Sequence, residues 1–365
     1  MKLELKRKLA IYFYFLFFWE FSRQQDINQN LDLESEYFNP RPKIQNPDLF
    51  SHSYHVGEKL SLTCLKKICE QSNYNSKSEP FILILISHPD NFYRRRIIRD
   101  TWGNEKDAEL LRGCLMFSVG RYLSYPNKGK FDYINKLVDQ EKAEFNDLLV
   151  LEINDTYQNL TLKVLNSMYV INSIVNPEQQ KQCKFSLIKS DDDMTLNMRK
   201  ISTYIKRTIR ELKRNNNNTN AIAGYVYEGG QVFRGTKNMW GVPNSLYPFS
   251  HYPFSHYAAG NTYILFPDII QPIINIAPFM PLIPIEDAHI TGILRRGVEK
   301  SKGSEVQLLN EPRFDHWSVI PNAHIDEGLI CDFKSGKRLT INGLFGDQLL
   351  KFWDTLTHID CNEAL

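Results

Sequence analysis

Three consecutive acids, Asp191, Asp192 and Asp193, follow an apolar stretch that runs from Phe185 to Ile188. Side chains alternate on an extended chain, so Asp191 and Asp193 face the same way, about 6.6 Å apart along the backbone. At an effective dielectric of about 20, two charges at that separation repel by roughly 2.5 kcal/mol. A bound cation would offset this repulsion, and a solvated turn would do the same.

If a cation binds here, Asp191 and Asp193, or Asp193 together with a bridging diphosphate, would suit Mg²⁺ or Mn²⁺. These ions take oxygen ligands and keep waters or substrate phosphates in their coordination shell. Two acids alone are a weak signal, because many surface turns contain such a pair. The triple aspartate therefore predicts either a metal site or an ordinary loop.

A second acid pair, Glu286 and Asp287, also follows an apolar stretch, in the sequence PIEDAHITG at 284–292. Either carboxylate could act as a general base, and His289 comes shortly after them. The alternative is helix N-capping, because an acid at the start of a helix is stabilised by backbone N–H groups and by the helix dipole. The sequence favours neither interpretation, and the two are compatible.

A basic segment, YRRRIIRDTWG, occupies residues 93–103. Its arginines could neutralise a diphosphate, because guanidinium groups bind phosphate oxygens in a bidentate manner. The alternative is a solvated helix face whose other side, with Ile97, Ile98 and Trp102, packs in the core. Taken alone, the segment favours the helix face. The arginines concerned are Arg94, Arg95, Arg96 and Arg99.

The elements that must position these residues alternate between strands and helices. Such alternation predicts an α/β fold with a mostly parallel sheet flanked by helices. Ligands bind outside the carboxyl ends of strands in such sheets, and the triple aspartate follows a strand, which favours a site over a loop. Apolar runs predict strands at 81–87, 114–120, 148–153, 185–189 and 221–227, and helical periodicity predicts helices at 131–146, 160–176 and 201–212.

The N-terminus has the pattern of a signal sequence or signal-anchor, because basic residues up to Lys8 precede the apolar run LAIYFYFLFFW. Extended to Phe21, this run gives about 20 Å of helix against a bilayer core of roughly 30 Å. A short membrane anchor, an uncleaved signal peptide and an amphipathic surface helix all remain open. The predicted organisation is a cytoplasmic tail at 1–8, a signal-anchor or transmembrane segment at 9–21, a stem or linker at 22–79 and a folded domain at 80–365.

Other features bear on the compartment and on the partners. The six cysteines form an even set, compatible with lumenal disulfides, although the sequence cannot choose among the pairings. Triplets that begin at Asn154, Asn159 and Asn217 fit the N-glycosylation pattern. The formal net charge of +2 gives no reason to expect a nucleic-acid partner.

Taken in order, these segments resemble glycosyltransferase family 31, the group of β-1,3-galactosyltransferases and β-1,3-N-acetylglucosaminyltransferases. Any one motif is weak, whereas the ordered set is specific. The matching motifs are IRDTWG at 98–103, DTYQNLTLK at 155–163, KSDDD at 189–193, YPFSHYAAGNTYIL at 252–265, EDAHITG at 286–292 and FDHW at 314–317.

The resemblance implies a GT-A-like fold, Rossmann-like, with a lumenal catalytic domain at 80–365. It implies the inverting transfer of a hexose from a UDP-sugar to a hydroxyl of an acceptor glycan in β-1,3 linkage. Galactose is the first expectation for that sugar, and an N-acetylhexosamine is the second. The expected setting is the Golgi membrane, with a glycoprotein or glycolipid as acceptor and a homodimer as a possible assembly.

The resemblance also assigns roles to residues. Asp193, with Asp191, would hold Mn²⁺ or Mg²⁺ against the donor diphosphate. Asp287, or in second place Glu286, would take the proton from the acceptor hydroxyl. Residues expected to contact the donor are Arg95, Arg99, Thr101, Trp102, Lys189, Asp191 and Asp192.

The sequence departs from the family pattern on a late strand, where the family carries a histidine as a further metal ligand. The comparable stretch here, RLTINGL, offers Asn342, whose amide oxygen can still bind a hard cation. This departure keeps open a sugar-binding protein of the same fold that has lost turnover. A haloacid-dehalogenase-like phosphatase with Asp191 as nucleophile is a further alternative, but its second acidic motif is incomplete because Lys351 stands at the last acid position.

Overall fold

The computed structural model describes residues 37–41, 43–56, 64, 65, 68, 79–123, 128–176, 183–228, 230–235, 239–250, 256–314 and 326–361. The predicted tail and anchor lie outside these residues. None of the helices in these ranges has both the length and the apolar character that crossing a bilayer requires.

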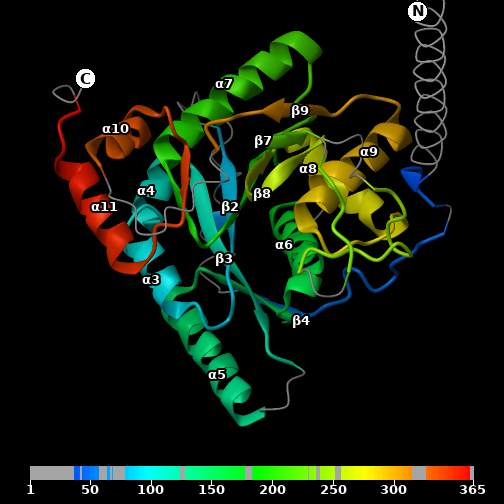
Figure 1. Ribbon diagram of the computed structural model, residues 1–365, viewed down its shortest axis with the longest axis horizontal. Coiled ribbons are helices and arrows are strands. Elements are labelled where there is room, and N and C mark those ends of the chain that lie inside the picture. Colours follow the sequence, from blue (N-terminus) through cyan, green and yellow to red (C-terminus); the bar gives the residue numbers. More distant parts are fainter. Residues whose placement is uncertain are drawn as a thin grey trace, which may run out of the picture.

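An eight-stranded sheet forms the centre of the molecule, in the order β1-β4-β3-β2-β5-β8-β7-β9 (Figure 1). The strands β4, β3, β2 and β5 are parallel, β8 runs antiparallel between β5 and β7, and β9 is parallel to β7. The bounds are β1 Tyr54–Val56, β2 Phe81–Ile86, β3 Gly113–Arg121, β4 Leu148–Asn154, β5 Ser186–Asp191, β7 Ala221–Glu228, β8 His256–Leu265 and β9 Gln307–Asn310. The predicted α/β fold with a mostly parallel sheet is confirmed.

Helices cover both faces of this sheet, and β2 shows why. Every residue of β2 is buried, and successive side chains enter different cores: Ile82 and Ile84 pack with α6, α8 and α9, whereas Leu83 and Leu85 pack with α3, α5, α7, α10 and α11. Figure 1 shows these two groups of helices on opposite sides of the sheet. The helices are α3 Phe92–Asp100, α4 Glu105–Leu110, α5 Lys128–Phe145, α6 Leu160–Val175, α7 Met198–Asn216, α8 Pro267–Ile276, α9 Arg295–Lys302, α10 Glu327–Ser335 and α11 Gly346–His358.

The predicted linker at 22–79 needs correction, because part of it belongs to the compact domain. β1 adds an edge strand antiparallel to β4, with Tyr54 opposite Leu151. Phe38 and Leu49 are buried in the core that contains α6 and α8. The packed part of the chain therefore begins before residue 80, since these isolated apolar side chains find cover on the sheet.

A short two-stranded sheet lies beside the end of β5. It pairs β6, Met194–Leu196, with β10, Thr340–Asn342, in antiparallel fashion. Asn342 lies opposite Met194, and the N–H of Gly343 donates to the carbonyl of Asp193 at 3.1 Å. β10, which carries Asn342 where the family pattern has a histidine, thus runs next to the triple aspartate.

The segment after the second acid pair is helical, as predicted, but begins as a π-helix over Ala288–Leu294 that continues into α9. π-Helical turns are rare, and they occur frequently at functional sites. Asp287 is the N-cap of this π-helix. The N-capping interpretation of this acid is therefore correct, and it leaves the catalytic interpretation open.

Candidate active site

The triple aspartate lies where β5 ends and the chain turns into β6. Asp191 is the last residue of β5, and Asp192 and Asp193 form the turn. The parallel register places Asp191 beside Ile86 at the end of β2, so the loop after β2 meets the aspartates. The carboxyl ends of the central strands thus converge on this motif, as the fold class predicts.

The carboxylate of Asp192 is bound within the protein. It accepts hydrogen bonds from the hydroxyl of Ser87 at 2.7 Å and the side-chain amide of Asn91 at 2.8 Å, and it lies 3.2 Å from the guanidinium of Arg94. Asp192 therefore fixes the β2–α3 loop against the triple aspartate. The sequence predicted a donor contact for this residue, and its side chain is instead occupied by protein donors.

Asp193 is in the opposite situation. Within the described part of the chain, no residue donates a hydrogen bond to its carboxylate or forms an ion pair with it. Burial raises its pKa to about 6, and the neighbouring charges of Asp191 and Asp192 add to that rise. A half-buried carboxylate without a partner is costly, so this one is suited to a cation that arrives with the substrate.

Lys189 joins the triple aspartate to the second acid pair. It is 1% exposed, and its Nζ lies 2.7 Å from Asp191 Oδ1 and 3.3 Å from Glu286 Oε2, while it also donates to the carbonyl of Gly260. Burial alone would lower the pKa of Lys189, but Asp191 and Glu286 raise it above its ordinary value. The ammonium is therefore charged, and it holds three elements together.

Glu286 lies in a closed environment. Its Oε1 accepts a hydrogen bond from the hydroxyl of Tyr263 at 2.5 Å, and its Oε2 faces Lys189. Burial raises the pKa of Glu286 to about 7, the positive charge of Lys189 opposes that rise, and Asp287 adds to it. Both oxygens are occupied in a side chain that is 3% exposed, which leaves Glu286 poorly placed to meet a substrate hydroxyl.

Asp287 is half-buried and more accessible than its neighbour. Its two oxygens accept backbone hydrogen bonds, Oδ2 from Gly260 at 2.9 Å and Oδ1 from Ala288 at 2.8 Å. Burial raises its pKa and these N–H groups oppose the rise. The carboxylate is therefore fixed in direction and keeps lone pairs free, as a general base requires.

Two tyrosines lie close enough to Asp287 for its negative charge to act on them. Tyr157, in the 3₁₀ turn Tyr157–Asn159, and Tyr227, on β7, both have a pKa raised by burial and by the negative charge of Asp287. The ring of Tyr227 lies 5.2 Å from that of Tyr257. Aromatic rings with polar tips thus lie near the carboxylate, where a sugar acceptor would need both apolar and hydrogen-bonding contacts.

Arg95 was predicted to contact the donor, and the structure places it in the interior. It is fully buried, and its N–H groups donate to Glu141, the Ser87 hydroxyl and the carbonyls of His88 and Pro89. With its donors used, no part of the guanidinium faces a ligand. Its link to the site is indirect, through Ser87 to Asp192.

The other predicted donor contacts from this segment are also structural. Arg99 binds Asp147 at 2.7 Å and Glu141 at 2.8 Å. The hydroxyl of Thr101 donates to the carbonyl of Ile97 at 2.7 Å, and Trp102 is 3% exposed in the core. These side chains pack against or bind protein groups around α3, and their direct contact with a donor stays a prediction. Arg94, to which the family resemblance gives no donor contact, reaches the triple aspartate through Asp192.

A buried ion pair that sequence reasoning missed supports the same edge. Lys163 on α6 donates to Asp155 Oδ2 at 2.7 Å and to the Ser87 carbonyl at 2.8 Å, and the N–H of Gly120 also donates to Asp155. This pair connects the ends of β2, β3 and β4. Both residues lie in the DTYQNLTLK motif, so the motif itself was the signal that could have found them.

The described residues near the triple aspartate offer a small set of oxygen ligands for a metal ion. Among the residues with a described placement, no group of three or more His, Cys, Asp or Glu side chains could hold a metal ion. The residues at hand are Asp193, the second oxygen of Asp191 and the amide of Asn342. Such a set suits an ion that is held by one or two carboxylates and completed by substrate phosphates and water.

Comparison with known proteins agrees with this geometry. Residues 93–302 match the model of the family described as galactosyltransferase. The chain is similar to beta-1,3-galactosyltransferase 1 of Mus musculus and of Homo sapiens, each 26% identical over 300 residues that cover 80% of both chains. It is also similar to beta-1,3-galactosyltransferase 2 of Pongo abelii, 26% identical over 84% of this chain and 64% of the other. The chain belongs to the galactosyltransferase family, and it is a glycosyltransferase.

Proposed function

We propose that this protein transfers galactose from UDP-galactose to a hydroxyl of an acceptor glycan in β-1,3 linkage, with inversion at the anomeric carbon. The observation that carries the proposal is the arrangement around Lys189. One buried ammonium joins Asp191, the neighbour of Asp193, to the acid pair that includes the accessible Asp287. A donor site and a base are thereby held on one rigid frame, as transfer between two bound sugars requires.

The donor diphosphate would bind at the triple aspartate. Asp193 would hold Mn²⁺ or Mg²⁺, with Asp191 and the amide of Asn342 in support, and the ion would neutralise charge on the departing UDP. Arg94 adds a cationic group at the same place, since its guanidinium lies over the ring of Phe345 and beside Asp192. Among the residues whose placement is described, none forms a hydrogen bond or ion pair with the Asp193 carboxylate, which supports this assignment.

Asp287 would act as the base toward the acceptor. Its carboxylate takes the proton of the attacking hydroxyl while the N–H groups of Gly260 and Ala288 keep it in place. The oxygen then attacks the anomeric carbon from the side opposite the leaving UDP, which inverts that centre. Glu286 stays in the interior and stabilises Lys189. Tyr227 and Tyr257 are the proposed surface for the acceptor sugar.

The proposed location is the Golgi membrane, with residues 9–21 as the anchor and the catalytic domain in the lumen. The described cysteines are all in disulfides, including Cys64–Cys114 and Cys331–Cys361, which supports an oxidising compartment. A protein that binds sugars on the same fold without turnover is the competing function, motivated by Asn342 at the position of the expected histidine.

The test is a donor screen with purified full-length protein. UDP-galactose, UDP-N-acetylglucosamine and UDP-N-acetylgalactosamine are each supplied with a panel of β-linked acceptor sugars, with and without Mn²⁺, and released UDP is measured. We expect Mn²⁺-dependent release with UDP-galactose that requires an acceptor. A preference for another UDP-sugar would show that galactose is the wrong donor while the protein is still a transferase. Binding of a UDP-sugar without release of UDP would favour the sugar-binding alternative.

A further inference from the structure

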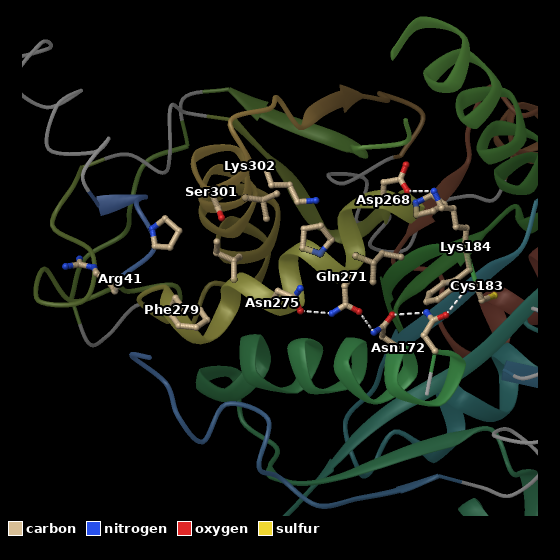
Figure 2. Close-up of a pocket in the computed structure, with 18 residues that line it drawn as sticks. Arg41, Asn172, Cys183, Lys184, Asp268, Gln271, Asn275, Phe279, Ser301 and Lys302 are labelled. Carbon is tan, nitrogen blue, oxygen red and sulfur yellow. Dashed lines mark hydrogen bonds and ion pairs between the residues drawn. The ribbon is translucent and has the colours of Figure 1, made fainter. Parts of the chain in front are cut away.

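A second concave site lies away from the triple aspartate, between α6, α8 and α9 (Figure 2). Its volume is about 720 Å³, within the range of roughly 300–1,000 Å³ that small-molecule sites occupy. Lys184 and Phe185, which line it, precede β5, whereas the triple aspartate begins at the last residue of the same strand. At about 3.3 Å per residue, that strand separates the pocket from the aspartates by roughly 17 Å.

A chain of side-chain amides crosses this pocket, as Figure 2 shows. The amide of Asn176 donates to Asn172 at 3.2 Å, Asn172 donates to Gln271 at 2.6 Å, and Gln271 donates to Asn275 at 2.6 Å. The backbone N–H of Cys183 begins the chain by donating to Asn176 at 2.7 Å. Two pairs of residues, each one helical turn apart on α6 and on α8, are thereby joined head to tail.

This arrangement leaves hydrogen-bonding capacity toward the opening. A side-chain amide has two N–H donors and an oxygen with two lone pairs, and each member of the chain uses only part of this capacity. Asn275, at the end, uses its oxygen, and its Nδ2 has no acceptor among the residues whose placement is described. The pocket therefore presents fixed donors and acceptors in alternation.

The rest of the lining combines apolar groups and flat rings with charged and polar side chains, among them Arg41, Ser301 and Lys302. Phe279 lies at one end of the pocket, and Pro40, Pro267 and Pro272 also line it. At the other end the ammonium of Lys184 lies 2.8 Å from Asp268, so neither charge is left for a ligand. Ring faces beside alternating amides suit a ligand with apolar C–H faces and hydroxyl groups that both donate and accept.

We propose that this pocket binds an oligosaccharide through its hydroxyl groups and C–H faces. The N-terminal turn of α8 is not itself an anion site, because Asp268 occupies it. A purely apolar ligand would leave the unused N–H donors and oxygen lone pairs of these amides without hydrogen bonds. In a glycosyltransferase, such a site would hold a distant part of the acceptor glycan, or a neighbouring glycan, without competing for the catalytic edge.

The test uses a printed array of neutral oligosaccharides and the full-length protein carrying Asp287→Asn, without UDP-sugar or metal. Gln271→Leu and Asn275→Ala are added separately to this background, with Gln140→Ala, an exposed amide on α5, as the matched control. Asn275 is exposed, so its variant keeps the fold if Gln271→Leu does not. We expect each pocket variant to weaken half-saturation on the best-bound glycan by about tenfold, the equivalent of one lost hydrogen bond, and the control to leave it unchanged.

Two outcomes would contradict the proposal that this pocket binds an oligosaccharide. If no oligosaccharide on the array binds, or if both pocket variants bind as the Gln140→Ala control does, the proposal is wrong. The pocket variants in the wild-type background should release UDP at the wild-type rate with a short acceptor. Loss of transfer with unchanged array binding would concern the active site alone, so this test is separable from that of the proposed function.

Discussion

The ammonium of Lys189 lies 3.3 Å from the Glu286 carboxylate, and this contact connects the two acidic motifs of the sequence. The same nitrogen binds Asp191 at 2.7 Å. The contact exists because β8 pairs antiparallel with β5, which sets Tyr263 opposite Lys189 and brings Gly260 to the same edge. A displacement of Lys189 would therefore alter both the proposed donor site and the proposed base.

Removing this ammonium should damage both stability and transfer. Lys189→Met leaves Asp191 and Glu286 without their buried partner, so we expect a loss of about 3–5 kcal/mol in the free energy of unfolding, together with loss of turnover. Lys337→Met, which removes an exposed lysine, should cost less than about 1 kcal/mol. Chemical denaturation of both variants measures the difference.

A double variant sharpens this prediction. Lys189→Met with Glu286→Gln removes the unpaired charge on Glu286, so part of the lost stability should return while turnover stays absent. If Lys189→Met unfolds like the wild type and keeps its turnover, the proposed coupling through this residue is wrong.

Asp193 should be needed for turnover and dispensable for the fold. Its pKa of about 6 lies above the ordinary value of 3.8, so the folded state binds more protons than the unfolded state between these values. The contribution of Asp193 to the free energy of unfolding therefore falls as pH rises from 3.8 to about 6. Without added metal at pH 7, Asp193→Ala should be at least as stable as the wild type, yet bind no Mn²⁺ with UDP in a calorimetric titration.

The control for this variant is Asp132→Ala, an exposed acid on α5. Full activity in Asp193→Ala would show that Asp193 is not the metal ligand. A marked loss of stability would instead give this aspartate a structural role.

His289 makes the domain sensitive to acid. It is fully buried in the π-helix, and neither ring nitrogen has a hydrogen-bond partner among the described residues. Burial lowers its pKa from 6.5 to about 3. Between pH 6.5 and 3 the imidazole of His289 is protonated in the unfolded state and neutral in the folded state. The contribution of His289 to the free energy of unfolding is therefore lost as pH falls from 6.5 toward 3.

His289→Leu should reduce this dependence. We expect the variant to be more stable by about 1–3 kcal/mol, because it removes unsatisfied buried nitrogens, and to have a shallower stability profile between pH 6.5 and 4. His358→Leu, which changes an exposed histidine on α11, is the control. A steeper profile in His289→Leu than in the wild type would contradict the assignment of a neutral buried imidazole.

Features that depend on neighbouring residues could be predicted from the sequence, whereas features that depend on residues far apart in the chain could not. The run FILILI predicted β2 because its apolar side chains are local evidence. β1, β6 and β10 are three residues long and exist only through their partners, so periodicity could not reveal them. Phe38 likewise looked like an isolated apolar residue in a polar segment, and its burial depends on helices that come much later in the chain.

The site shows the same division. The acids and Lys189 were found from motifs, because the residue types themselves carry the chemistry. Whether Arg95 faces a diphosphate or the interior was decided by Glu141, a carboxylate on α5 that no local pattern connects to it. The different roles of Asp192 and Asp193 likewise depend on Ser87 and Asn91, which the fold brings to only one of the two.

The most direct test of the account separates Asp287 from Glu286. Transfer from UDP-galactose is measured for Asp287→Asn and Glu286→Gln, together with the affinity for UDP in the presence of Mn²⁺. We expect Asp287→Asn to bind UDP as the wild type does and to lose about 10²–10⁴-fold in turnover, the usual contribution of a general base. Glu286→Gln should lose less turnover and show reduced stability at neutral pH, because its partner Lys189 remains. Wild-type turnover in Asp287→Asn would contradict the account.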